Sequence, residues 1–246
     1  MTSLVLAVSW LTVVPAHGPT EVDRRIAGRA IALAPLVGVL LGGAAAGALW
    51  LLHPAGTAAG MAAVAVLALA TRGMHLDGLA DTFDGLGTYG PPERAREVMK
   101  SGGAGPFGVA ALGFAIGIQA LAFAELAAAG RWLAVGLAVT LGRVAVVAAC
   151  RRGVDAAPRA WFGALVAGTQ SPFTALGWTA AAVGAGILAV PALPWAGPMV
   201  VLAASGVAVL LVRHCVRRIG GLSGDVLGAA IELATTVAAL GFALAA

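Results

Sequence analysis

The chain has 246 residues, of which 60% are hydrophobic and only 11% are charged, and its mean hydropathy is +0.96. A soluble domain carries about a quarter charged residues, so this composition excludes an ordinary soluble protein and indicates an integral membrane protein. The formal net charge is +4, but no basic stretch is interleaved with aromatic residues that could stack on bases, so we expect no nucleic-acid partner.

The first apolar segment, Leu4 to Val14, is shorter than the roughly 20 residues that a helix needs to cross a bilayer. It also lacks the basic start and the small-residue cleavage site of a signal peptide. We therefore expect a retained helix that lies in the membrane interface.

Later apolar segments come close to spanning length, and together they predict an all-α, polytopic bundle of six to seven transmembrane helices. The second of them is short enough to be re-entrant or tilted instead. The whole chain, residues 1–246, forms one integral membrane catalytic domain in this interpretation. The expected spans are 30–52, 56–71, 105–129, 132–150, 173–194, 197–212 and 226–246.

The basic residues indicate the orientation of this bundle. If the chain crosses at each span, all but two of the fifteen Lys and Arg residues fall on one side. The exceptions are Arg131, in an opposite loop, and Arg143, inside a span. Because cytoplasmic loops carry an excess of Lys and Arg, we expect the basic side to be cytoplasmic, the protein to lie in the cytoplasmic (inner) membrane, and the active site to face the cytoplasm.

An acidic motif opens the longest loop, which covers about residues 72 to 104. On a helix, Asp77, Asp81 and Asp84 are four and three residues apart and therefore share one face. Clustered carboxylates repel one another unless a cation lies between them, and an all-oxygen cluster suits Mg²⁺ or Mn²⁺ better than zinc. A solvated acidic face is the alternative, but the strict spacing and the apolar flanks favour a metal site.

Other polar residues on the same side are weaker candidates. His75 precedes the motif and is placed to contact a phosphate, or simply to lie at headgroup level. The glycine-rich stretch that leads to Gly105 offers backbone N–H groups to a phosphate, although it is also an ordinary helix stop. Arg143 lies seven residues before Cys150, at the end of its span, which places it roughly 10 Å inside the membrane at 1.5 Å per residue. An arginine at this depth either binds an anion or extends its side chain to the surface. Asp225 opens the last span after a second glycine-rich turn that does not fit a P-loop.

A carboxylate cluster with arginines at a membrane face is typical of metal-assisted phosphoryl transfer on an amphiphilic substrate. CDP-alcohol phosphotransferases, which act on lipids, are one alternative. Their Asp-Gly-x-x-Ala-Arg motif differs from Asp77-Gly78-Leu79-Ala80-Asp81, and their later aspartate pair is missing. A transporter is a less favoured alternative, because the polar residues gather at one face and no internal repeat is visible.

The stretch His75–Gly85 resembles the signature of the cobalamin-5′-phosphate synthases, which are adenosylcobinamide-GDP ribazoletransferases. Similar blocks follow the same order across nearly the whole chain. Departures from the family pattern are Arg72, Thr235 and Gly103, the last standing where many members carry an aspartate. The other similar blocks are Leu11–Pro15, Pro35–Gly38, Arg94–Lys100, Gly105–Gly108, Gly142–Arg143 and Gly220–Ala229.

This resemblance implies a Mg²⁺-dependent transferase of cobalamin biosynthesis that joins α-ribazole, or its 5′-phosphate, to adenosylcobinamide-GDP and releases GMP. It implies a metal role for Asp77, Asp81 and Asp84, and makes Asp225 a further ligand or the catalytic base. The expected partners are these small-molecule substrates and the lipid bilayer, and a homo-oligomer stays open. The residues implied in substrate contacts are His75, Lys100, Gly105 and Arg143.

Overall fold

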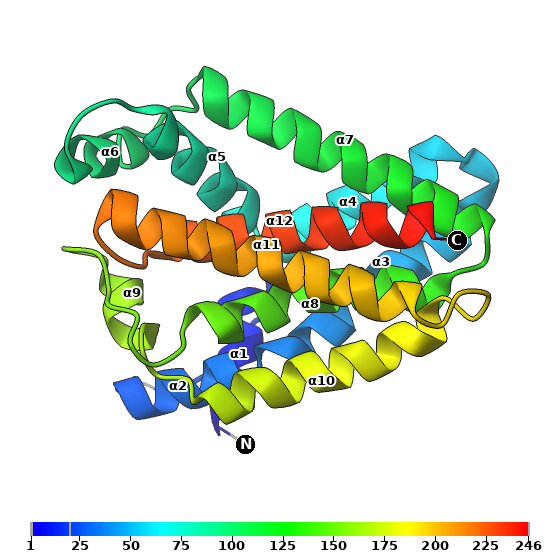
Figure 1. The fold of residues 1–246 in the computed structure, drawn as a ribbon, viewed down its shortest axis with the longest axis horizontal. Helices are drawn as coiled ribbons and strands as arrows, with labels where there is room; N and C mark the ends of the chain where they lie inside the picture. The colour runs from blue at the N-terminus through cyan, green and yellow to red at the C-terminus, as the bar shows by residue number, and fades with distance from the viewer. Residues whose placement is uncertain (1, 20, 246) are drawn as a thin grey trace.

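The computed structural model describes residues 2–19 and 21–245, and within these ranges the chain is helical, with two isolated β-bridges and no strand (Figure 1). In chain order the helices are α1 (Thr2–Leu11), α2 (Arg24–Ala32), α3 (Ala34–Leu52), the 3₁₀-helix η1 (His53–Ala55), α4 (Thr57–Ala70), α5 (Met74–Gly87), α6 (Pro92–Met99), α7 (Pro106–Ala128), α8 (Trp132–Ala149), α9 (Trp161–Val166), α10 (Pro172–Ala189), α11 (Ala196–Ile219) and α12 (Gly224–Leu244).

Six of the described helices are long and apolar enough to cross a membrane: α3 with η1, α7, α8, α10, α11 and α12. Helices α4 and α5 meet at a bend of 92° and would make a seventh span if counted together. The expected all-α bundle of six to seven spans is therefore confirmed. The short segment 56–71 corresponds to α4, which is one arm of the bent pair.

Three span boundaries differ from the prediction. The fifth span ends with α10 at Ala189 rather than at residue 194. The first span begins at Ala34 rather than at residue 30, because α2 ends at Ala32 and Pro35 opens a new helix. Proline has no N–H to donate and suits the first turn of a helix. The sixth span continues beyond residue 212 to Ile219, and Gly220, with φ of +90°, ends α11 in the left-handed conformation. The additional turns carry Arg213, Arg217 and Arg218.

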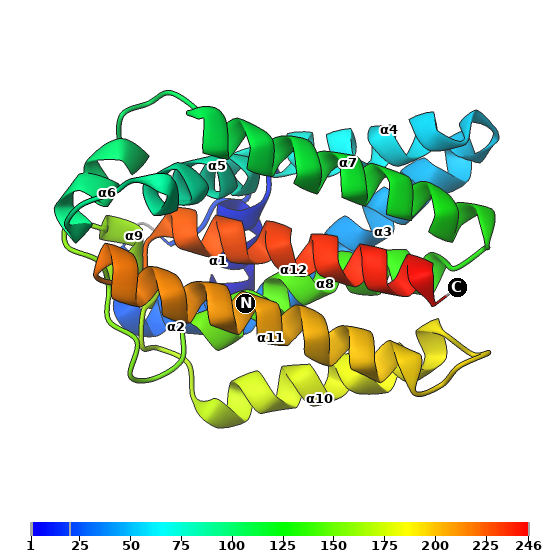
Figure 2. The same cartoon turned by 45° about the horizontal axis from the view of Figure 1, so that its top comes forward.

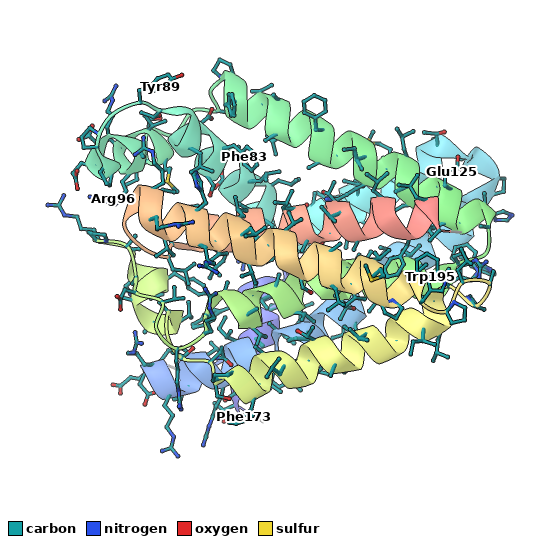
Figure 3. All side chains as sticks on the ribbon, viewed as in Figure 1. Phe83, Tyr89, Arg96, Glu125, Phe173 and Trp195 are labelled. Carbon is teal, nitrogen blue, oxygen red and sulfur yellow. The ribbon has the colours of Figure 1, made fainter. Side chains whose placement is uncertain are left out.

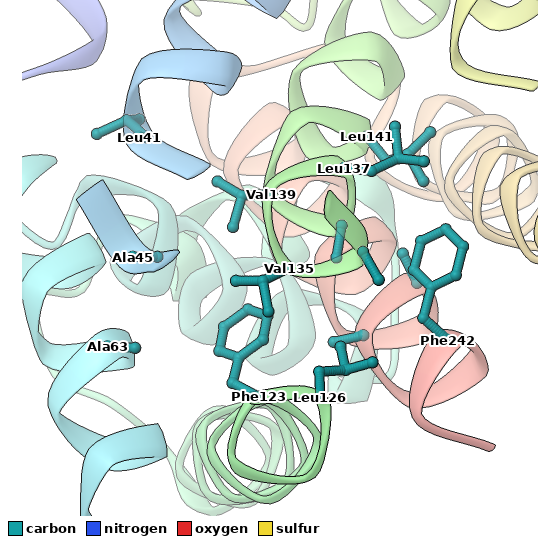
Figure 4. Close-up of a cluster of buried hydrophobic side chains, with 14 of the residues drawn as sticks. Leu41, Ala45, Ala63, Phe123, Leu126, Val135, Leu137, Val139, Leu141 and Phe242 are labelled. Atoms are coloured by element: carbon teal, nitrogen blue, oxygen red, sulfur yellow. The ribbon is translucent and has the colours of Figure 1, made fainter. Parts of the chain in front are cut away.

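Helix α8 lies at the centre of the bundle and packs against α3 and α12. Close approach depends on small residues, as is common between membrane helices. A Cβ on Gly42 would lie 2.9 Å from the Cα of Gly136, so α3 and α8 almost touch there. Figure 4 shows Phe123 of α7 beside Val135 of α8, with Phe242 of α12 in the same cluster, and both phenylalanines are fully buried.

The two ends of the bundle differ. Helices α5, α6 and α9 gather at one end, together with the end of α11 and the start of α12 (Figure 2). Tyr89 and Arg96 mark this end in Figure 3, and Glu125 and Trp195 mark the opposite end. Polar loops therefore converge at one end, where the acidic motif also lies.

Candidate active site at the start of α5 and α12

The acidic motif folds as predicted into a helix, α5. It begins after Gly73, whose φ of +68° lets the chain turn sharply out of α4. Along the helix Asp77 is exposed, Asp81 is half-buried and Asp84 is buried, so the acidic face runs from solvent into the protein.

Packing of α12 on α5 adds a fourth aspartate. A Cβ on Gly78 would lie 2.7 Å from the carbonyl oxygen of Asp225, so the first turn of α12 rests directly on α5. Asp81 consequently lies within range of the negative charges of Asp77 and Asp225, as well as that of Asp84. The structure thus brings the two distant aspartate motifs of the sequence together.

Asp84 has a different environment from its neighbours. Its Oδ2 accepts the N–H of Gly105 at 2.6 Å, and its Oδ1 accepts the N–H of Gly108 at 2.8 Å. These donors belong to the first turn of α7, where the helix dipole also favours a negative charge. The carboxylate of Asp84 therefore ties α5 to α7, and the N–H of Gly105, for which we expected a substrate contact, is donated to Asp84.

The donor set fits a magnesium ion that is held in part by substrate. No three Asp, Glu, His or Cys side chains within residues 2–19 and 21–245 converge enough to form a metal cage. Mg²⁺ is usually bound through one or two carboxylates, with waters and substrate phosphates completing its shell. Asp77, Asp81 and Asp225 offer oxygen ligands whose mutual repulsion a bound cation would relieve.

Three neighbouring cavities open around the start of α12. The inner cavity, of about 330 Å³, is bordered by Trp10, His75, Asp77, Phe162 and Asp225 among others. The middle cavity, of about 220 Å³, shares Phe162 and Asp225 with the inner one and adds Arg96 and Lys100. The outer cavity, of about 310 Å³, contains Arg96, Lys100 and Arg159 together with Glu93 and Glu97. Lys100, an expected substrate contact, thus borders two of the three.

Arg143 lies apart from these cavities. It is 3% exposed, and its Nη2 lies 3.3 Å from Nδ1 of His75. A guanidinium can only donate, so Nδ1 accepts and the neutral imidazole carries its proton on Nε2. Arg143 borders a small space of about 10 Å³, which it shares with His75, Gln119, Glu232 and Thr235.

Glu232 of α12 accepts a hydrogen bond from Gln119 Nε2 at 2.8 Å. It lies close enough to Arg143 for their charges to interact. The structure therefore shows a buried polar group inside the bundle, and His75 connects this group to the inner cavity.

Sequence reasoning missed the aromatic side of the site. Trp10 of α1 and Phe162 of α9 pack edge to face with ring centroids 5.1 Å apart, and Trp161 lies beside Phe162. The six-residue helix α9 carries no motif and is too short to be detected by periodicity. Ser223, in the glycine-rich turn before α12, caps this helix and donates to Oδ2 of Asp225 at 3.2 Å.

Gly78→Ala is expected to lower both stability and catalytic activity. The new methyl group would meet backbone atoms of Asp225, which cannot rotate away, so α5 and α12 would have to separate. Overpacking of this kind costs about 1–3 kcal/mol. The measurement is the melting temperature in detergent together with the turnover rate.

Gly43→Ala is the matched control, because a Cβ there meets nothing within 4 Å. It should leave both quantities unchanged or slightly raise the melting temperature. Wild-type behaviour of Gly78→Ala would show that the contact between α5 and α12 is not required.

Comparison with known proteins identifies the family of the chain. The family model described as cobalamin-5-phosphate synthase matches residues 3–243. Proteins named adenosylcobinamide-GDP ribazoletransferase are similar along nearly their whole length. The relative from Frankia casuarinae is 37% identical over 97% of this chain and 93% of its own. The relative from Nocardioides sp. is 42% identical over 96% of both chains.

A third relative with this name, from Corynebacterium efficiens, is 37% identical over 97% of this chain and 90% of its own. No solved structure matches the chain significantly. The family match and the relatives together cover the acidic helix, the three cavities and the last span. The chain belongs to the cobalamin-5-phosphate synthase family.

Proposed function

We propose that the protein joins α-ribazole, or its 5′-phosphate, to adenosylcobinamide-GDP with release of GMP, the assembly of the nucleotide loop in cobalamin biosynthesis. Family membership over residues 3–243 and the relatives' activity support this reaction. The observation that carries it is the position of Asp225, which joins the acidic face of α5 and borders both the inner and the middle cavity.

In this reaction a ribazole hydroxyl oxygen forms a bond to the phosphorus attached to cobinamide. The anhydride P–O bond breaks, and its electron pair leaves with GMP. The hydroxyl proton passes to a carboxylate, and Asp225 is suited to accept it because it borders both cavities. Lys100, which lies near enough to influence Asp225, offsets negative charge on the phosphates.

Asp77 and Asp81 would hold Mg²⁺ here, with Asp84 as a further acid in range, and Asp225 stays free to act as the base. Bound Mg²⁺ would supply positive charge to the diphosphate. Among the chain's own residues, Arg96 and Lys100 would hold the phosphates through their positive charge, and the acceptor hydroxyl would lie beside Asp225.

The test is an assay of purified protein with adenosylcobinamide-GDP, ribazole 5′-phosphate and Mg²⁺. GMP release that requires all three supports the proposal, and kcat/KM for ribazole against its phosphate identifies the preferred acceptor. GMP release without an acceptor would instead indicate hydrolysis, and no release from well-folded protein would contradict the function.

We also propose that the end marked by Tyr89 faces the cytoplasm and that the membrane is the inner membrane. The end carries the basic loops, which the positive-inside tendency places in the cytoplasm. A cysteine at Tyr89, which is 97% exposed, should react with a membrane-impermeant thiol reagent only from the cytoplasmic side. A cysteine at the exposed Ala129 should react only from the other side.

The native thiols do not interfere, because Cys150 and Cys215 are both buried. Labelling of the Tyr89→Cys and Ala129→Cys variants from the same side would overturn the proposed orientation.

A further inference from the structure

The three cavities form a series in which polarity changes in one direction. The outer cavity is bordered by charged residues, with Arg96, Lys100 and Arg159 opposing two glutamates. The middle cavity keeps Arg96 and Lys100 but adds aromatic residues. The inner cavity is mainly apolar; its charged lining residues are Arg72, Asp77 and Asp225, and the two aspartates belong to the acidic site. Charged and apolar parts of the substrates therefore have separate places to bind.

The inner cavity also has an aromatic side. Trp10 and Phe162 form an edge-to-face pair, and Trp161 continues this surface. Aromatic side chains bind planar rings by stacking or by edge contacts, and they do so without requiring hydrogen bonds. A cavity with this lining selects for a flat ring system with few polar groups.

Resting on the proposed function, we infer that the inner cavity binds the apolar heteroaromatic base of the acceptor nucleoside, with its ribose directed at Asp225. The diphosphate of the other substrate then lies toward Lys100 in the middle and outer cavities. Asp225 is shared by the inner and middle cavities, so the acceptor hydroxyl and the phosphorus meet beside it.

The competing occupant is the guanine of the GDP group. Guanine has donors and acceptors along its edge. The acidic groups of the inner cavity, Asp77 and Asp225, are taken by the metal and the acceptor hydroxyl in this arrangement, so most of that edge would face apolar side chains and stay unpaired, which is unfavourable. A benzimidazole-type base has one free ring nitrogen and is otherwise apolar, so it loses little on entering. A volume of about 330 Å³ also falls in the range of small-molecule sites, which runs from about 300 to 1,000 Å³.

The test varies the ribazole concentration at saturating adenosylcobinamide-GDP, and then the reverse, in wild-type protein and in Phe162→Ala. The KM for ribazole should rise about tenfold or more, because loss of one stacking side chain has an effect of this order. The KM for the GDP substrate should stay within about twofold, since its charged part is held elsewhere.

Because Phe162 packs against Trp10, a second variant is needed to separate a loss of ribazole binding from a loss of folding. Trp161→Ala truncates a side chain that is 72% exposed and should shift the same KM without loss of stability. Phe173→Ala, at an 84% exposed residue of α10, is the control and should change neither KM. In addition, ribazole alone should quench the tryptophan fluorescence of wild-type protein.

A larger change in the KM for the GDP substrate than for ribazole would overturn the inference and place guanine in the inner cavity. Unchanged KM values in both Phe162→Ala and Trp161→Ala would also overturn it and would indicate that the cavity holds lipid instead of the base. Either result leaves the proposed function standing if GMP release is intact. Absence of GMP release in wild-type protein would instead remove the function itself.

Discussion

Asp77→Asn and Asp81→Asn should each lower kcat/KM for GMP release about 100-fold or more, while the protein still inserts and folds. Each substitution removes a charged oxygen from the partial shell that would hold Mg²⁺ against the diphosphate. Loss of such stabilisation costs several kcal/mol, and about 1.4 kcal/mol corresponds to tenfold in rate. Asparagine has the same shape as aspartate, so neither the exposed Asp77 nor the half-buried Asp81 meets a steric conflict when it is replaced.

Asp155→Asn is the control for these variants, because Asp155 is an exposed acid whose backbone, and not its side chain, bonds to Leu222. Its turnover should match wild-type protein. Near-normal turnover in both Asp77→Asn and Asp81→Asn would exclude the shared metal site.

Asp84→Asn separates two roles for the third aspartate. An amide has one oxygen and cannot accept from both Gly105 and Gly108 as the carboxylate does. If Asp84 mainly ties α5 to α7, this variant loses melting temperature together with activity. If the metal role implied by the family pattern dominates, activity falls while the melting temperature stays at the wild-type value.

Arg143→Leu is expected to slow transfer by about tenfold or more, and to do so through His75. Removing the guanidinium leaves Nδ1 of His75 without its donor, so the Nε2–H tautomer is no longer enforced. Loss of a buried hydrogen bond to a charged group costs about 1.5–3 kcal/mol, which corresponds to this rate effect. Insertion should not suffer, because the variant removes a charge from the membrane. Arg143→Lys keeps the charge but loses the planar fork, and should be intermediate.

A double-mutant cycle decides whether the arginine acts through the histidine. The variant with both His75→Ala and Arg143→Leu should be no slower than His75→Ala alone. Additive losses, with a raised KM for the GDP substrate, would show that Arg143 contacts phosphate directly as the sequence first suggested. ¹⁵N spectra of the histidine ring give an independent readout, because only the wild-type arginine fixes the tautomer.

Local patterns were enough to predict much of the fold. The spans follow from apolar length, and the acidic helix face follows from the spacing of Asp77, Asp81 and Asp84. The error at the first span has a local cause as well: α2 and α3 are separate helices, and Pro35 marks where the second begins. The composition alone favoured one continuous apolar segment there.

The parts of the site that were not predicted depend on contacts between distant segments. Asp84 bonds to residues more than twenty positions later, and His75 meets Arg143 sixty-eight positions later. The spacing of residues within one helix does not predict such contacts. The role of Asp225 was anticipated only as an alternative, because its place beside α5 depends on the absence of a side chain at Gly78.

Binding of Mn²⁺ to the purified protein, followed by electron paramagnetic resonance with adenosylcobinamide-GDP and no acceptor, tests the metal site most directly. Mn²⁺ substitutes for Mg²⁺ at oxygen sites. Wild-type protein and Asp155→Asn should bind the ion with the same affinity in a substrate-dependent manner. The variant carrying both Asp77→Asn and Asp81→Asn should bind it about tenfold more weakly or not at all. Equal binding by this double variant would contradict a cation site on the acidic face of α5.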